Sequence, residues 1–305
     1  MNVSRLSFLK TVFAVLILLL TAGVQAQISQ TDTLRLFLIG NSFSQNAAKY
    51  LPQLAAEGNH PLVIGRAEIG GCSLQKHWEL AELAETDPAN PAGRPYKDKS
   101  LRMLLSEGRW DVVTIQQNSM NSADVNTYRP YARKLYDFIK SIQPNAKVVF
   151  HQTWAYRIDS KDFSQVANGV FAKNSDEMWK KSRAAYHEVA KELGIAIMPV
   201  GDAMQKVAKS KKWGYRVDSK FDLAHPVYPN LPDQQNSLHA GYYWDANKKL
   251  AFDSHHASNA GCFLGALVWY RFLFGESPEH LKFVPKDVPG AFGIQLKKVA
   301  DSVVK

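Results

Sequence analysis

Three side chains in two distant segments have the chemical types that nucleophilic catalysis uses. Ser42 follows an apolar segment and a glycine, and Asp253 stands three residues before His256. In a serine, histidine and carboxylate triad, the imidazole removes the hydroxyl proton and the carboxylate holds the imidazole in the required orientation. The chain order Ser42, Asp253, His256 therefore predicts acyl-transfer chemistry, provided that the fold brings the two segments together.

The segment around Ser42 predicts a strand, a tight turn and a helix. Residues 34–44 read LRLFLIGNSFS, a mostly apolar run that ends at Gly40 and leads into a helix-like stretch. This order would place Ser42 at the carboxyl end of a strand, beside a helix N-terminus whose local field favours a developing negative charge. A buried strand followed by a serine that only caps the helix would show the same pattern.

Neighbouring residues offer rivals for two of the three roles. Ser44 is a second candidate nucleophile, but it would lie in the first turn of the helix and serve as its cap. His255 is a second candidate base, although it stands two rather than three residues from Asp253. We therefore favour Ser42 and His256.

Carboxylate and imidazole side chains such as these can also bind a metal ion. Zinc could bind Asp253, His255 and His256, but adjacent histidines do not readily face one ion. The spacings His-x-Glu and His-x3-His, which are typical of zinc sites, are absent from this segment. We expect neither a metal nor an organic cofactor.

The rest of the chain alternates between strand-length apolar runs and helical patterns. Five such alternations with short turns predict a parallel five-stranded sheet covered by helices on both faces. Ligands of such sheets bind at the carboxyl ends of the strands. The expected strands are 34–40, 62–66, 110–115, 148–151 and 195–200, and the expected helices are 46–58, 74–84, 101–107, 128–141, 174–193, 262–274 and 290–305.

Polar and glycine residues follow two of these strands. Gly70 and Gly71 precede a helical segment, and adjacent glycines leave backbone N–H groups free to face a ligand. A turn that only requires a positive φ angle would look the same. Residues 116–119, Gln-Gln-Asn-Ser, supply side-chain donors and acceptors after the third strand.

Residues 213–247 show neither a helical nor a strand pattern and are rich in tryptophan and tyrosine. We expect an aromatic loop insertion, because this composition argues against disorder. Its rings could stack on sugars or could cover the core of the domain itself. The candidates for substrate binding are Tyr243 and Trp244 in this segment and Trp154 after the fourth strand.

The sequence resembles the SGNH (GDSL-type) hydrolase superfamily, in a bacterial branch similar to the domain of unknown function DUF4886. Gly40-Asn41-Ser42-Phe43-Ser44 resembles the first block of the superfamily, Gly-Asp-Ser-x-Ser. Gly70-Gly71-Cys72-Ser73 resembles its glycine block. Asp253 and His256, followed by Ser258 and Gly261 ahead of a helix, resemble its last block.

The resemblance implies a flavodoxin-like three-layer α/β sandwich, with Ser42 as nucleophile, His256 as general base and Asp253 as the residue that orients it. It also implies that the backbone N–H groups of Ser42 and Gly71 form an oxyanion hole, which stabilises the tetrahedral intermediate. Two positions depart from the superfamily pattern. Asn41 replaces an aspartate, and the usual third block is not recognisable, so that Asn118 or Gln117 is the expected third donor.

The first 26 residues have the pattern of a signal peptide. Arg5 and Lys10 precede or border an apolar run that is followed by small residues at 24–26. We expect an exported protein, periplasmic or secreted, in which residues 27–305 form a single hydrolase domain without an integral membrane segment.

The net charge and its distribution narrow the class of binding partner. Removing Arg5 and Lys10 lowers the formal net charge from +9 to +7, which is spread over many expected helices without an arginine-rich tract. We therefore expect no nucleic acid partner.

Export would allow a disulfide between Cys72 and Cys262, and two buried thiols are the other interpretation.

These observations together predict an exported serine esterase that removes an acyl group, with acetyl on a small or polymeric carbohydrate as the expected substrate. The alternatives are a non-catalytic glycan-binding protein on the same fold, an esterase of lipids or short acyl chains, and an acyltransferase. Hydrolase and transferase share the acyl-enzyme step.

Overall fold

The structure is a computed structural model that describes residues 33–163 and 172–304. The expected signal peptide at 1–26 lies outside the described residues. Among the helices that the structure describes, none combines the length and the apolar character needed to cross a membrane.

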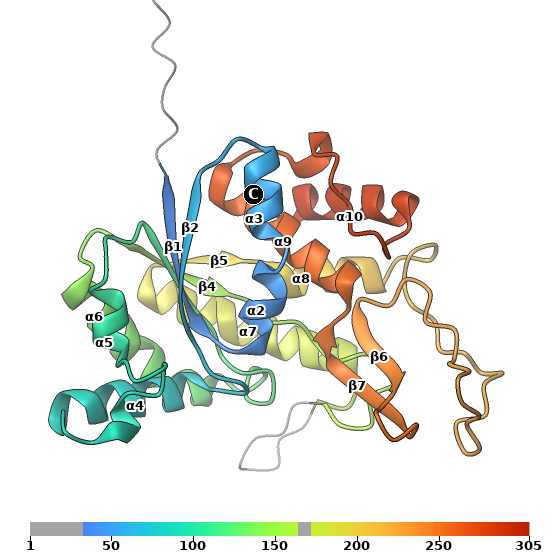
Figure 1. The fold of residues 1–305 in the computed structure, drawn as a ribbon, viewed down its shortest axis with the longest axis horizontal. Helices are drawn as coiled ribbons and strands as arrows, with labels where there is room; N and C mark the ends of the chain where they lie inside the picture. The colour runs from blue at the N-terminus through green and yellow to red at the C-terminus, as the bar shows by residue number, and fades with distance from the viewer. Residues whose placement is uncertain (1–32, 164–171, 305) are drawn as a thin grey trace, which may run out of the picture. The chain divides into compact units, whose positions relative to one another are not determined.

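One parallel sheet of five strands forms the centre of the domain (Figure 1). Its order is β2-β1-β3-β4-β5, so the chain extends the sheet first on one side of β1 and then on the other. This reversal creates the crevice at the carboxyl ends of β1 and β3 where ligands of such sheets bind. The predicted fold class is confirmed. The strands are β1 (Leu34–Gly40), β2 (Leu62–Glu68), β3 (Val112–Ile115), β4 (Lys147–His151) and β5 (Ala196–Met198).

The apolar sequence of β1 is explained by burial on both of its faces. Successive side chains of a strand point to opposite sides. Leu36 and Leu38 accordingly join one hydrophobic core, whereas Phe37 and Ile39 join the other. A strand covered on both faces reads as a continuous apolar run, which is why β1 was recognisable from the sequence.

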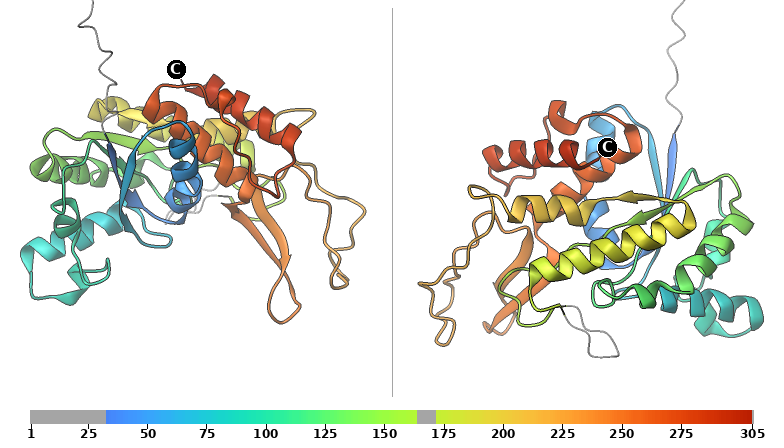
Figure 2. Two further views of the ribbon diagram at one scale, coloured as in Figure 1. Left: turned by 45° about the horizontal axis from the view of Figure 1, so that its top comes forward. Right: turned by 180° about the vertical axis from the view of Figure 1, so that it is seen from behind.

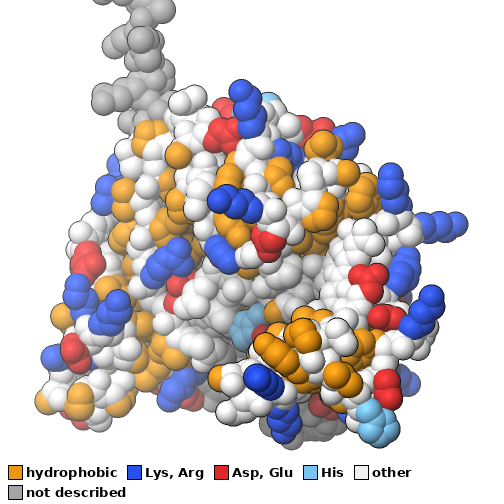
Figure 3. All heavy atoms as spheres, turned by 45° about the vertical axis from the view of Figure 1, so that its right-hand side comes forward, with side chains coloured by type: hydrophobic (Ala, Val, Ile, Leu, Met, Phe, Trp, Pro, Cys, Tyr) orange, Lys and Arg blue, Asp and Glu red, His pale blue; other side chains and the backbone are white. Residues whose placement is uncertain are grey.

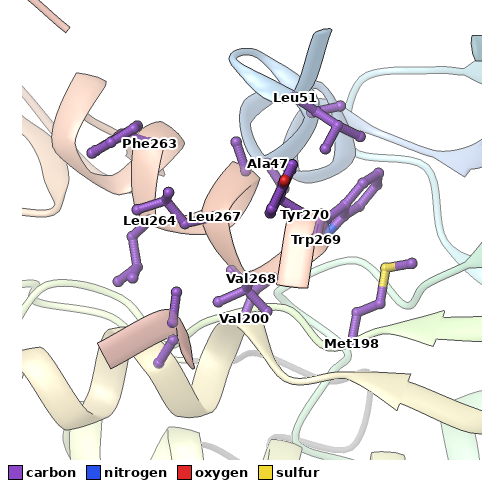
Figure 4. Packing of buried hydrophobic residues seen from close by; sticks show 14 of the residues in the cluster. Ala47, Leu51, Met198, Val200, Phe263, Leu264, Leu267, Val268, Trp269 and Tyr270 are labelled. Atoms are coloured by element: carbon purple, nitrogen blue, oxygen red, sulfur yellow. The ribbon is translucent and has the colours of Figure 1, made fainter. Parts of the chain in front are cut away.

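Helix α9 is the centre of the first helical layer. All ten residues from Gly261 to Tyr270 are buried, as expected for a helix that is apolar on every side. Figure 4 shows Leu267 and Val268 of α9 close to Ala47 and Val200, which belong to neighbouring helices. The layer contains α2 (Ser42–Ala48), α3 (Leu51–Glu57), α8 (Val200–Ala208), α9 (Asn259–Phe274), the short η3 (Pro278–His280) and α10 (Gly290–Val303).

The second layer covers the opposite face of the sheet. Figure 2 shows α7 in front of the sheet when the domain is seen from behind, whereas α2 and α9 lie in front of it in Figure 1. This layer contains α4 (Leu74–Thr86), α5 (Leu101–Leu105), α6 (Tyr131–Ile142) and α7 (Ser175–Leu193), with the short helices η1 (Pro91–Gly93) and η2 (Val125–Tyr128).

The prediction of a loop over the whole of 213–247 is wrong. Strand β6 (His239–Trp244) pairs antiparallel with β7 (Leu250–Ala257) and forms a hairpin beside the loop that precedes it (Figure 2). β6 carries aromatic residues on both faces, and β7 is half-buried along its length, so neither shows the apolar and polar alternation of an ordinary strand. The segment from Asp253 to His256 is part of strand β7.

Two smaller differences concern boundaries, and the structure decides between the two interpretations of the cysteines. The helix expected at 46–58 is two helices, because α2 already begins at Ser42 and Pro52 lies at the start of α3. The strand expected at 195–200 ends at Met198, and α8 begins at Val200. Cys72 and Cys262 are buried free thiols and form no disulfide.

Candidate active site

Ser42 occupies the first position of α2, directly after the turn that follows β1. Asn41 caps this helix, since its side-chain oxygen accepts the N–H of Phe43 at 3.0 Å. A Cβ at Gly40 would lie 2.5 Å from Ser44 Oγ and 2.9 Å from Gln116 Oε1, so only glycine fits there. The local sequence therefore holds the Ser42 side chain at the carboxyl edge of the sheet.

Strand β7 brings the distant carboxylate and imidazole to this serine. His256 Nδ1 lies 2.7 Å from Asp253 Oδ2, and His256 Nε2 lies 2.9 Å from Ser42 Oγ. Because Nδ1 faces a carboxylate, we assign it the proton, which leaves the Nε2 lone pair for the Ser42 hydroxyl. This is the geometry in which an imidazole can deprotonate an alcohol.

The electrostatics of the pair favour an ionised carboxylate and a basic imidazole. Partial burial would raise the pKa of Asp253, but the hydrogen bond from the His256 ring and the backbone N–H groups of His256 and His255 outweigh it and hold the pKa well below its usual range. The hydrogen bond to Asp253 in turn raises the pKa of His256, against an opposing effect of desolvation. Asp253 is thus a carboxylate at neutral pH.

The rival residues lie beside the triad but are oriented differently. His255 Nδ1 is 3.2 Å from Asp253 Oδ1, and burial lowers the pKa of His255. Ser44 is fully buried, with Oγ 2.8 Å from the Asn41 carbonyl and 2.6 Å from Glu68 Oε1. The structure therefore places His256, and not His255, against the hydroxyl of Ser42, and it directs Ser44 into the protein interior.

A cleft of about 380 Å³ opens next to Ser42. Figure 3 shows a hollow in this face of the molecule, with a histidine side chain, coloured pale blue, in its wall. Gly71 lines the cleft with a φ angle of +67°, which favours glycine at this position of the turn after β2. The cleft is lined by Asn41, Ser42, Phe43, Gly70, Gly71, Asn118, Ser119, Met120, Tyr156, His255 and His256.

The sequence pattern described as "Domain of unknown function (DUF4886)" matches residues 35–225, more than half of the chain. The chain belongs to the DUF4886 family. The matched residues include Ser42, Gly71 and Asn118 and end before Asp253 and His256. The branch predicted from the sequence is thereby confirmed.

Two solved structures are similar to this chain, and the first of them shows the same fold. The crystal structure of a DUF4886 family protein from Bacteroides uniformis has a TM-score of 0.66 at 21% identity, covering 89% of this chain and 94% of that chain. A protein from Slackia heliotrinireducens assigned to the SGNH hydrolases has a TM-score of 0.48 at 21% identity, covering 79% of this chain and 100% of that chain. A comparison with curated proteins gives no match.

In this DUF4886 protein, Asn118, one of the two residues predicted as third oxyanion donor, lines the cleft beside Gly71. Its Nδ2 donates to the Gly71 carbonyl at 3.0 Å, and its Oδ1 accepts the N–H of Asn121 at 3.1 Å. An amide nitrogen carries two hydrogens, and Gly71 uses one of them. Asn118 can therefore offer the second hydrogen to a ligand in the cleft.

Gln117 is the wrong alternative for this donor. Its side chain is fully buried, and its oxygen accepts the N–H groups of Leu74 and Asn118 at 3.1 and 2.9 Å. Its nitrogen donates to the Thr127 carbonyl at 2.9 Å. Adjacent residues after a strand point in opposite directions, and the sequence alone did not show which of the two faces the cleft.

Trp154 is a supporting residue and does not bind substrate as predicted. It is 1% exposed, its ring stacks on Phe43 at 4.2 Å, and its Nε1 donates to the His255 carbonyl at 2.8 Å. Trp154 thus joins the helix of the nucleophile to the strand of the base. An aromatic residue at a strand end does not reveal whether it points into a cleft or into the core.

Tyr243 and Trp244, the other two predicted substrate-binding residues, do not line this cleft, and substrate binding by them stays a prediction. They pair with Ala251 and Leu250, five and six residues before His256. At a rise of about 3.3 Å per residue, this separation places them roughly 17–20 Å along the hairpin. The Trp244 ring instead donates from Nε1 to the Asn230 carbonyl at 3.0 Å.

Sequence reasoning missed Tyr156, Ser119 and Met120 as cleft residues. The Tyr156 hydroxyl lies 2.9 Å from Ser119 Oγ, so the two side chains form one polar wall. The position of Tyr156, five residues after β4, gave no signal beyond its nearness to a strand end. Ser119 belonged to the polar stretch after β3 that the sequence singled out, but its role was not specified.

A metal would compete with this triad. Ligand atoms of Asp253, His255 and His256 lie within 4.8 Å of one another. Asp253 Oδ2 and the two nitrogens of His256 are, however, already joined to each other and to Ser42 by hydrogen bonds. A cation held by these atoms would have to break the contacts that make Ser42 reactive.

Proposed function

We propose that this DUF4886 protein is a serine esterase that forms an acyl-enzyme on Ser42. The observation that carries the proposal is the unbroken hydrogen-bonded series from Ser42 Oγ through His256 to Asp253, with lengths of 2.9 and 2.7 Å. These residues come from two segments that the fold alone brings together. The Ser42 hydroxyl also lies at the N-terminus of α2, where the local field favours a developing negative charge.

The arrangement supports the following course of reaction. Ser42 Oγ attacks the ester carbonyl while His256 Nε2 takes its proton, and the Asp253 carboxylate stabilises the imidazolium. The oxyanion faces the N–H groups of Ser42 and Gly71. His256 then donates the proton to the leaving alcohol as the ester C–O bond breaks. A water molecule, deprotonated by His256, releases the acid and restores Ser42.

The shape and polarity of the cleft favour a small acyl group on a polar alcohol. Its volume of about 380 Å³ is at the lower end of ligand sites. Asn118, Ser119 and Tyr156 in its wall offer hydrogen bonds to hydroxyl groups. We therefore propose acetyl groups on a carbohydrate as the substrate class. An exported protein, periplasmic or secreted, would meet such a substrate outside the cytoplasm.

Acetate release from acetylated oligosaccharides tests the substrate class. The purified protein should release acetate, and its activity on nitrophenyl esters should fall as the acyl chain lengthens beyond a few carbons. Ser42→Ala should release none, whereas Ser302→Ala, a hydroxyl deletion on α10, should match the unaltered protein. Preference for long acyl chains, with no acetate released from any glycan, would replace the carbohydrate ester with a lipid ester.

A further inference from the structure

A buried histidine on α4 contacts the turn that carries Ser42. His77 is fully buried, and its Nε2 lies 2.9 Å from the Gly40 carbonyl. A carbonyl can only accept, so Nε2 carries the proton, and Nδ1 must accept the hydroxyl hydrogen of Tyr96 at 2.8 Å. The result is a directed series of hydrogen bonds from Tyr96 through His77 to Gly40, two residues before the nucleophile.

Tyr96 comes from the surface excursion between α4 and α5. Its backbone N–H and carbonyl both pair with Lys99, and its side chain is only 8% exposed. Gly93 packs against Ala84 of α4 so closely that an added Cβ would lie 2.8 Å from the Ala84 Cα. The excursion is therefore fixed to α4, and it holds the Tyr96 hydroxyl in place.

A second buried histidine is linked to the same turn through Gln116, from the opposite face of the sheet. His151 Nδ1 lies 2.8 Å from Gln116 Oε1, and Gln116 Nε2 donates to Asn41 Oδ1 at 2.7 Å. The His151 ring packs on Trp269, which belongs to the hydrophobic core on the Leu36 side of β1. Tyr96 belongs to the core on the Phe37 side. The turn from Gly40 to Ser42 is thus held on both sides of the sheet.

We propose that Tyr96 with His77, and His151 with Gln116, are positioning residues for Ser42. This inference rests on the proposed esterase function. Ser42 must keep its hydroxyl at His256 while its N–H faces the oxyanion, and small displacements in such sites cost large factors in rate. Gly40 has no side chain that packing could lock. Its carbonyl and the amide of Asn41 are the groups through which the protein can fix the turn.

A purely structural role is the alternative, because satisfied buried histidines also stabilise cores. The two roles differ in their kinetic effect. Loss of a structural contact lowers the melting temperature and leaves the rate constant of the folded protein unchanged. Loss of a positioning contact lowers kcat and leaves KM unchanged, because the ground-state contacts of the substrate remain.

The variant Tyr96→Phe tests the first pair, with Tyr270→Phe as its control. The control also deletes one hydroxyl from a buried ring. The hydroxyl of Tyr270 donates to Glu276 at 3.0 Å, beside the C-terminus of α9. We expect Tyr96→Phe to lower kcat on nitrophenyl acetate about tenfold with KM within about twofold, and Tyr270→Phe to leave both unchanged. Equal kcat values for the two variants would overturn the inference.

His77→Gln and His77→Leu extend the test to the histidine. Glutamine can still donate to the Gly40 carbonyl, so we expect it to retain several-fold more of kcat than leucine. Gln116→Met, which deletes the amide that joins His151 to Asn41, should lower kcat without raising KM. An unchanged kcat in Gln116→Met would remove the second pair from the proposal.

Hydrogen exchange separates this inference from the esterase function. The backbone amides at 40–43 should exchange at least about tenfold faster in Tyr96→Phe than in Tyr270→Phe, whether or not the protein hydrolyses esters. Equal exchange in the two variants overturns the positioning role. If the unaltered protein hydrolyses no ester while the two variants still differ in exchange, the esterase function is overturned and the positioning role stands.

Discussion

Asn41 donates from its side-chain nitrogen to the Cys72 carbonyl at 2.9 Å, and this bond joins the turns that follow β1 and β2. The same amide accepts the N–H of Phe43 and so caps α2. The neutral side chain of Asn41 thereby fixes Ser42 relative to Gly71. The backbone N–H groups of Ser42 and Gly71 are the two proposed oxyanion donors. An aspartate carboxylate could cap the helix but could not donate to Cys72.

Asn41→Asp should therefore lower activity, although aspartate is the residue that the superfamily pattern has at this position. The substitution places a carboxylate oxygen against the Cys72 carbonyl oxygen, so that two hydrogen-bond acceptors face each other. It also adds a negative charge beside the developing oxyanion. We expect a loss of about tenfold or more in kcat, of the size found when an oxyanion contact is weakened. Steady-state kinetics on nitrophenyl acetate measure it, and unchanged kcat would contradict this role for Asn41.

The dependence of activity on pH should reflect His256. The imidazole must be neutral to accept the Ser42 proton, so kcat/KM falls as the pH drops through the pKa of His256. The hydrogen bond to Asp253 raises that pKa, which sets the acidic limb at a higher pH than for an ordinary histidine. A pH profile of kcat/KM checks this directly.

Asp253→Asn should change that profile in two ways. Without the carboxylate, the pKa of His256 is no longer raised, and the acidic limb moves to lower pH. The maximal rate should fall by roughly 10³- to 10⁴-fold, since the asparagine no longer stabilises the imidazolium or selects its tautomer. An acidic limb that stays in place would mean that another group titrates.

The strands β1, β3 and β4 could be predicted from the sequence because burial on both of their faces gives a continuous apolar run. The triad was predictable for a different reason, because Ser42 and His256 stand in recognisable local blocks. The direction in which side chains point at the ends of the strands could not be predicted from the sequence. Trp154 and Gln117 are buried and Asn118 lines the cleft, and contacts with distant parts of the chain, such as Phe43 for Trp154 and Leu74 for Gln117, hold these directions. The hairpin of β6 and β7 was missed because half-buried aromatic strands lack alternation.

Trp154→Phe should impair catalysis more than a matched change on the hairpin. The variant loses the hydrogen bond to the His255 carbonyl and part of the stacking on Phe43, which connect β7 to α2. We expect a destabilisation of about 1–3 kcal/mol together with a lower kcat. Trp244→Phe, at the far end of the hairpin, should leave kcat within about twofold. Equal effects on kcat in the two variants would contradict the assignment of Trp154.

Arg157 should be the main anchor of the hairpin and of the loop before it. It is buried, pairs with both oxygens of Asp159 at 2.7 and 2.8 Å, and donates to Gln234 at 2.6 Å. Its guanidinium also lies 4.4 Å from the centre of the Tyr215 ring and 4.8 Å from that of Phe252.

Arg157→Leu leaves the Asp159 carboxylate without its cationic partner, and we expect about 3–5 kcal/mol of destabilisation. Thermal melting measures the loss, and limited proteolysis should show earlier cleavage within 213–238. Arg109→Leu, which removes an exposed partner of Asp111, is the control and should change stability by less than about 1 kcal/mol. Comparable losses in the two variants would contradict the anchoring role.

The central claim is that Ser42 is the nucleophile, and mapping a covalent adduct tests it most directly. The purified protein is treated with a fluorophosphonate, digested and analysed by mass spectrometry. The account predicts one phosphonyl group on Ser42, formed slowly in His256→Gln and not at all in Ser42→Ala. An unmodified protein, or an adduct on another residue that persists in Ser42→Ala, would contradict it.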